Sequence, residues 1–148
     1  RYVEVSLGTW DYHYDLWDHL PAMAAELDNS ATNLLDDLET RGLLKSTLVV
    51  IATEFGRKPE ISQTIGRDHH PHGYTIWMAG GGIKPGVVHG GTDDFGFNAM
   101  EKKVHVHDLQ ATILHLLGLD HEQLTYRYAG RDFRLTDVYG SVVKGILA

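Results

Sequence analysis

The chain has 148 residues, of which 43% are hydrophobic and 22% charged, which is ordinary for a globular protein and fits a single domain portion at residues 1–148. Its formal net charge of -7 argues against nucleic-acid binding, because attraction to phosphates depends on Lys and Arg side chains. The absence of cysteine excludes disulfides, thiolate metal sites and thiol nucleophiles, and no apolar run reaches the roughly 20 residues that span a bilayer.

The first part of the chain predicts a strand, a long helix and a second strand. Residues 2–7 alternate in the manner of a strand, so Asp11 is expected just beyond its end. Apolar residues recur at steps of three and four from 16 to 44, which predicts an amphipathic helix that ends at Arg41-Gly42. The continuous apolar run 47–52 predicts a strand buried on both faces. This order favours a right-handed parallel unit.

The rest of the chain predicts a polar site loop, a strand and two helical segments. Residues 53–73 are rich in Gly, Pro, Arg and His, which is typical of a functional loop. We expect a buried strand at 74–79, a helix that Asp108 caps and Gly118 ends, and an amphipathic segment at 136–147. These elements predict an α/β protein. Because its first residues resemble neither an initiator Met nor a signal peptide, the chain is expected to begin within a domain.

Side chains that bind metals stand next to the predicted strands. Asp11 and His13 follow the first strand, Glu54 follows the second, and an Asp-His-His cluster at residues 68–70 precedes the third. Because ligands bind beyond the carboxyl ends of parallel strands, we expect Asp11 and Glu54 to point into one crevice. Carboxylate and imidazole ligands favour a zinc ion, whereas carboxylate-rich sets suit calcium, magnesium or manganese.

Several of these residues also have a structural interpretation. Asp11 could cap the helix that follows it, and Arg57 could neutralise Glu54 in place of a metal ion. Asp15 and His19 lie four residues apart, a spacing that puts two side chains on one helix face and makes them a rival ligand pair. For that second pair, a solvated polar face is the favoured interpretation.

Basic side chains of the loop at 53–73 predict an anion site. Arg57 and Arg67 carry guanidinium groups, whose planar fork suits a phosphate or sulfate group, and Lys58 adds a third positive charge. Ordinary solvation of the loop is the alternative. We assign Arg57, Arg67 and His69 to substrate binding.

Four segments together resemble the DUF1501 family. They are GTWDYH at 8–13, TEFGR at 53–57, GRDHHP at 66–71 and HVHDLQATILHLLG at 105–118. The resemblance covers essentially the whole chain and implies the C-terminal portion of a sulfatase-like protein of the alkaline phosphatase superfamily. The implied fold is a three-layer α/β/α sandwich with a mostly parallel sheet. Asp11 and His13 look like a metal-binding pair that His70 completes, and Glu54 looks like a further ligand. Phe55 stands where a metal-binding His is usual in the superfamily. This sequence therefore departs from the pattern that forms a full second metal site.

The resemblance implies metal-dependent hydrolysis of phosphate or sulfate esters, with small-molecule or carbohydrate substrates. The nucleophile is expected upstream of these residues, so no catalytic residue is assigned and the fragment is expected to have weak activity or none. A periplasmic or extracellular setting is also implied, and an exposed sheet edge would allow a homo-oligomer. Two alternatives stay open: a non-catalytic binding or assembly protein that retains the sulfatase-like fold, and a phosphomutase-like isomerase.

Overall fold

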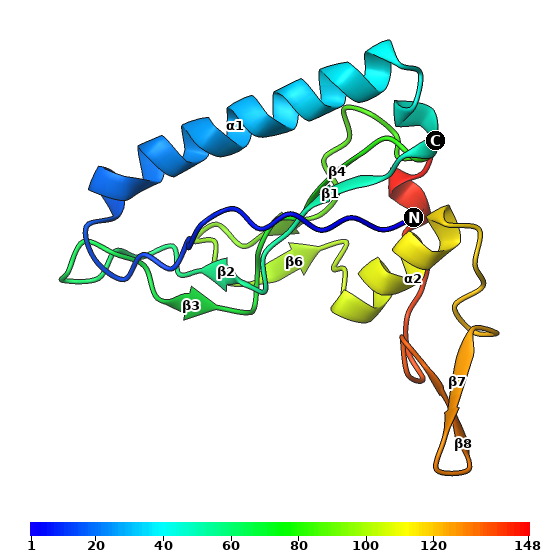
Figure 1. Cartoon of the computed structure of the whole chain (residues 1–148). Helices are drawn as coiled ribbons and strands as arrows, with labels where there is room; N and C mark the ends of the chain where they lie inside the picture. The colour runs from blue at the N-terminus through cyan, green and yellow to red at the C-terminus, as the bar shows by residue number, and fades with distance from the viewer.

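The computed structural model describes all 148 residues, which form helices and small two-stranded sheets joined by irregular segments (Figure 1). The α-helices are α1 (Leu16–Thr40) and α2 (Val106–Leu116), and the 3-10 helices are η1 (Leu44–Ser46) and η2 (Lys144–Ile146). Four antiparallel pairs of strands complete the chain: β1 (Val49–Ile51) with β4 (Trp77–Ala79), β2 (Gly56–Arg57) with β3 (His69–His70), β5 (Gly91–Thr92) with β6 (Ala99–Glu101), and β7 (Thr125–Tyr128) with β8 (Arg131–Arg134).

The predicted three-layer α/β/α fold with a mostly parallel sheet is wrong. The segments predicted as strands at 47–52 and 74–79 form β1 and β4, but these pair antiparallel, with Val50 opposite Met78. A parallel pair needs a crossover, usually a helix, that returns the chain to the starting edge of the sheet. Residues 52–76 contain no helix and form the β2–β3 hairpin beyond the end of β1. The chain therefore enters β4 where it left β1.

The predicted strand at residues 2–7 is also wrong. This segment joins no sheet (Figure 1), and Tyr2, Val3 and Val5 are 84%, 83% and 85% exposed. An alternating pattern becomes a strand only when a neighbouring strand satisfies its backbone hydrogen bonds. Each of the four sheets has two strands, and residues 2–7 pair with none of them.

The long amphipathic helix is confirmed as α1. Its half-buried positions follow one apolar stripe at steps of three and four: Leu20, Met23, Leu27, Ala31, Leu35 and Leu38. The helix ends at Thr40, next to the predicted Arg41-Gly42 stop signal, and the φ of 68° at Gly42 is a left-handed conformation that glycine adopts without strain. The Leu43 amide then donates to the Leu38 carbonyl at 2.8 Å and Gly42 to Glu39 at 2.9 Å, which satisfies the last helical carbonyls.

The small hydrophobic core lies around α2. Ala111 and Leu114 are buried on one face of this helix. Thr112, also buried, accepts a hydrogen bond from the Val143 amide at 2.9 Å and so ties the C-terminal segment to α2. The helix begins with a capping box in which Asp108 accepts from the His105 amide, so the predicted cap residue takes part three positions inside the helix. The predicted amphipathic segment at 136–147 is helical only over η2.

The β7–β8 hairpin projects from the α2 end of the molecule (Figure 1). Its turn residues Ala129 and Gly130 both have positive φ, at 48° and 83°, which matches the two-residue turns whose twist suits a hairpin. Tyr126 and Tyr128 are exposed on its strands. No helix of the protein is both long and apolar enough to cross a membrane.

Candidate metal centre

The candidate site is built on a backbone contact between residues 12–16, which precede and enter α1, and residues 62–67, which lie between β2 and β3. We call this contact the seam. Its three shortest hydrogen bonds run from the Arg67 amide to the Tyr12 carbonyl at 2.9 Å, from the Leu16 amide to the Ile65 carbonyl at 2.9 Å, and from the Thr64 hydroxyl to the His13 carbonyl at 2.6 Å. The seam fixes the segment that carries Asp11 against the hairpin that carries His69.

Gly66 allows the seam to close. A Cβ atom at this position would lie 2.0 Å from the carbonyl carbon of His13 and 2.1 Å from its oxygen. Both are backbone atoms, which cannot turn aside as a flexible side chain can. Only glycine fits here, and the buried Gly66 therefore has a direct part in placing His13.

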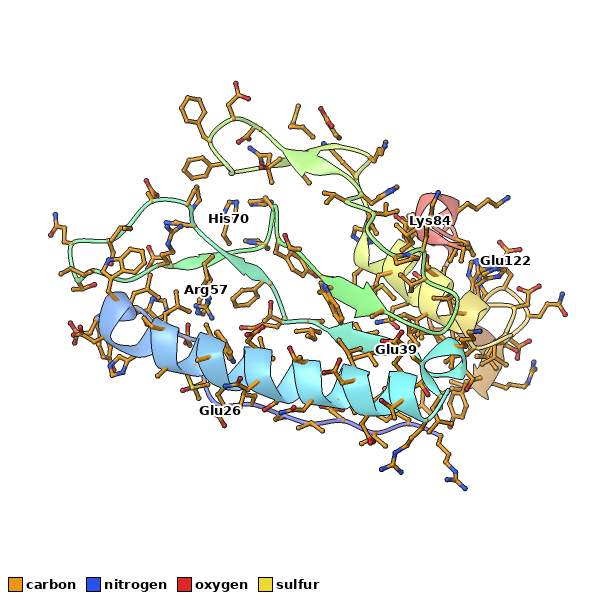
Figure 2. The ribbon with its side chains drawn as sticks, turned by 90° about the horizontal axis from the view of Figure 1, so that it is seen from above. Glu26, Glu39, Arg57, His70, Lys84 and Glu122 are labelled. Atoms are coloured by element: carbon orange, nitrogen blue, oxygen red, sulfur yellow. The ribbon has the colours of Figure 1, made fainter.

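The register of the β2–β3 hairpin decides which side chains face the seam. Arg57 pairs with His69, and Gly56 pairs with His70. Since successive residues of a strand point to opposite faces, His69 shares a face with Arg57, and His70 points the other way. Figure 2 shows the two labelled side chains on opposite sides of the hairpin, Arg57 toward α1 and His70 away from it.

Three potential metal ligands converge on the face that Arg57 shares with His69. The Nε2 atom of His13 lies 3.0 Å from Oδ1 of Asp11 and 3.2 Å from Nε2 of His69, and His69 Nε2 lies 2.9 Å from the same Asp11 oxygen. Ligands about 2.0–2.1 Å from a tetrahedral zinc ion lie roughly 3.3 Å apart, so the observed triangle is close to the required size. One oxygen and two imidazole nitrogens also suit zinc chemically. The donor set therefore fits a zinc ion.

A second carboxylate supports the first imidazole from behind. Asp68 Oδ1 lies 3.3 Å from Nδ1 of His13 and accepts its proton, while Lys58 Nζ donates to the other oxygen of Asp68 at 3.3 Å. This bond fixes the tautomer that leaves the Nε2 lone pair of His13 free to face Asp11 and His69. A carboxylate on the far nitrogen is the usual support of a metal-binding histidine.

Arg57 is the cation that contacts the triangle. Its Nη1 atom donates to Oδ1 of Asp11, and its Nη2 atom lies 3.6 Å from Oε1 of Glu54. Glu54 therefore reaches the site through Arg57, as the structural interpretation of the sequence suggested, and lies outside the three-ligand triangle. The ring of Phe55 packs 4.5 Å from the His69 ring and 5.6 Å below the Arg57 guanidinium, centroid distances that make it a support for both.

The family of the chain follows from one comparison. The model of the DUF1501 family, described as a protein of unknown function, matches residues 1–147. The chain belongs to the DUF1501 family. Comparisons with curated proteins and with solved structures gave no match.

Hydrogen bonds lower the pKa values of both aspartates in the DUF1501 protein's site. A bond from His69 and a second from Arg57 lower the pKa of Asp11 to about 2. A bond from Lys58, followed by one from His13, lowers the pKa of Asp68 below its ordinary value. Both carboxyl groups are therefore anionic at neutral pH, which is the form that binds a cation.

The remaining predicted site residues of the DUF1501 protein lie outside the triangle. His70 is buried and its Nε2 atom contacts the Phe97 carbonyl oxygen, so the structure does not bring it to Asp11 and His13. Arg67 donates to the carbonyls of Lys58 and Pro59 at 2.9 and 2.8 Å and thereby holds the loop rather than facing the triangle.

The rival ligand pair is also accounted for. His19 stacks on the Tyr12 ring at 5.4 Å, and the Asp15 amide donates to Thr64 across the seam at 3.3 Å. The sequence interpretation missed the support that Asp68 and Lys58 give His13, although Asp68 stood in the quoted cluster. Asp68 precedes β3, so strand alternation does not place its side chain, and no sequence pattern signalled this contact.

Proposed function

We propose that this DUF1501 protein is a metal-dependent hydrolase of phosphate or sulfate esters, with a zinc ion held by Asp11, His13 and His69. The observation that carries the proposal is the triangle of ligand atoms, which all lie within 4.8 Å of one another and have an acidic support behind His13. The resemblance of these segments to sulfatase-like proteins adds the reaction class. Small-molecule or carbohydrate esters are the proposed substrates, in a periplasmic or extracellular setting.

The geometry favours a catalytic over a structural metal site. Three protein ligands leave the fourth position of a tetrahedral ion open, whereas structural zinc sites are closed by four. Asp11 and His69 have side chains that are 51% and 48% exposed, so a substrate can reach this position. A bound ion would supply Lewis-acid polarisation of an ester oxygen and a nucleophile at neutral pH.

The chain's own residues have distinct roles in this proposal. Asp11, His13 and His69 bind the ion, and Asp68 keeps the His13 proton on Nδ1. Arg57 adds a guanidinium beside the open position, where its fork can hold the anionic oxygens of a phosphate or sulfate group.

Zinc binding by substituted proteins tests the proposal. We expect His69→Gln to weaken zinc binding by at least about tenfold, because it removes one of three ligands, and His70→Gln to leave it unchanged, because His70 faces the other side. Bound zinc is measured by elemental analysis and by competition with a coloured chelator. Hydrolysis is measured with 4-nitrophenyl phosphate and 4-nitrophenyl sulfate as substrates. Failure of the unsubstituted protein to bind zinc, or loss of zinc in His70→Gln alone, would reject the assignment.

A non-catalytic binding or assembly protein is the second candidate. Phe55 favours it, since this ring packs on His69 where a metal-binding His was expected. Carbohydrate or partner binding that survives the His69→Gln substitution would favour this candidate.

A further inference from the structure

Asp11 Oδ1 is the most crowded polar atom of the site. It contacts Nη1 of Arg57, Nε2 of His13 and Nε2 of His69 at once. A carboxylate offers about four lone-pair positions over its two oxygens, so the hydrogen bonds from Arg57 and His69 fill the two on Oδ1. An ion bound by Asp11, His13 and His69 would need this same oxygen or a turn of the carboxylate. In both arrangements the ion and Arg57 compete for the carboxylate of Asp11.

We propose that Arg57 is a competitor of the metal ion for Asp11, and that its displacement by the ion makes it available to the oxyanion of the substrate. The inference rests on the metal centre of the proposed function and adds a coupling between its two ligands. In the metal-free protein Arg57 neutralises Asp11. In the metal-bound protein its Nη1 atom is released, and an anionic oxygen takes the place of Asp11.

The surroundings of Arg57 allow this exchange without expelling the side chain into solvent. Its side chain is only 22% exposed. Glu54 lies 3.6 Å from Nη2, and the Phe55 ring lies 5.6 Å from the guanidinium carbon. These two contacts can hold the guanidinium beside the site after it leaves Asp11. The planar fork keeps one edge on Glu54 and offers another outward, which the single ammonium of lysine cannot do.

The exchange predicts that metal and oxyanion bind cooperatively through Arg57. Without an anion, the positive charge of Arg57 opposes a divalent ion at close range. When phosphate or sulfate binds, its negative charge neutralises Arg57, and the electrostatic repulsion between Arg57 and the metal ion is removed. By linkage, each ligand then raises the affinity of the site for the other by the same factor.

The test measures zinc affinity by chelator competition, with and without inorganic phosphate, in the unsubstituted protein and in Arg57→Gln, Arg57→Lys and Arg41→Gln. Arg57→Gln removes the competing charge, so we expect its zinc affinity without phosphate to rise on the order of tenfold. Arg57→Lys keeps the charge without the fork, and its affinity should stay near that of the unsubstituted protein. Both variants should lose most of the gain that phosphate gives. Arg41→Gln is the matched control, because it removes a surface Arg–Asp pair on α1 and should change nothing.

The outcomes separate this inference from the proposed function. Zinc binding by the unsubstituted protein with equal or weaker binding by Arg57→Gln would overturn the competition and leave the metal centre standing. An undiminished effect of phosphate in both Arg57 variants would overturn the coupling. Absence of zinc binding in every variant, each shown to be folded by its thermal unfolding, would reject the metal centre and with it this inference.

Discussion

Replacing Gly66 with alanine should separate the two halves of the metal centre. The new Cβ atom would lie 2.0 Å from the His13 carbonyl carbon, whereas ordinary contacts begin at 3.4 Å, so relieving the clash requires the seam to open by about 1.4 Å. If it opens, its three shortest hydrogen bonds are lost at about 1 kcal/mol each. If it stays closed, overpacking strain of about 1–3 kcal/mol takes their place. Either response costs up to about 3 kcal/mol of local stability.

The expected functional result is a loss of zinc affinity. His13 lies on one side of the seam and His69 on the other, with 3.2 Å between their Nε2 atoms. A displacement of more than 1 Å spoils the triangle, so zinc binding should weaken by more than about tenfold. Chelator competition measures this affinity, and hydrogen exchange of the Leu16 and Arg67 amides reports whether the seam has opened.

A glycine of β5 provides the control for this substitution. Gly91→Ala adds the same methyl group at a position without positive φ, where the nearest atom would be 3.6 Å away. It should leave both zinc affinity and amide protection unchanged. Unaltered zinc affinity in Gly66→Ala, together with full protection of the Leu16 and Arg67 amides, would refute the assembly of the site through this seam.

Three further predictions concern the support of His13, the charge of Asp11 and the core. Asp68→Asn weakens the acceptor of the His13 proton and should reduce zinc affinity about 10–100-fold with no drop in melting temperature, whereas an unchanged affinity would contradict the support role. Because the pKa of Asp11 is lowered to about 2, its ionic contacts should persist above its ordinary value of 3.8 and be lost as the pH falls through 2; an NMR titration midpoint near 4 would be incompatible with them. Leu114→Ala should cost about 2–4 kcal/mol in urea unfolding, compared with about 0.5 kcal/mol or less for the exposed Leu117→Ala, and equal costs would argue against a core at α2.

Local patterns predicted the elements whose cause is local. The apolar stripe and the Gly42 stop define α1 without help from the rest of the chain. The direction of β4 relative to β1 has no local cause, because it depends on whether residues 52–76 form a crossover between the two strands. These residues show no helical periodicity, and that was the available sign that a parallel crossover would not form. The β7–β8 hairpin was not predicted, although the Ala129-Gly130 turn between alternating segments was a local signal for it.

The sequence indicated which segments contribute to the site better than which of their side chains meet there. Asp11 and His13 were named with the cluster at 68–70, and the structure brings both residues to His69. The choice between His69 and His70 depends on the register of a two-residue strand, which no periodicity can reveal over so short a segment. Most hydrogen bonds of the seam join backbone atoms, which any residue type can supply. The seam therefore leaves little trace in the sequence beyond the glycine at position 66.

The triangle joins residues that are 58 positions apart in the chain, Asp11 and His69. An ion held there would act as a removable cross-link in a protein that has no cysteine for a permanent one. At a free zinc concentration about 100 times the dissociation constant, such binding adds about 2.7 kcal/mol to the stability of the folded chain. The end of the molecule that carries the hairpin of β2 and β3 would then melt according to the zinc supply of its surroundings, independently of the contacts around α2.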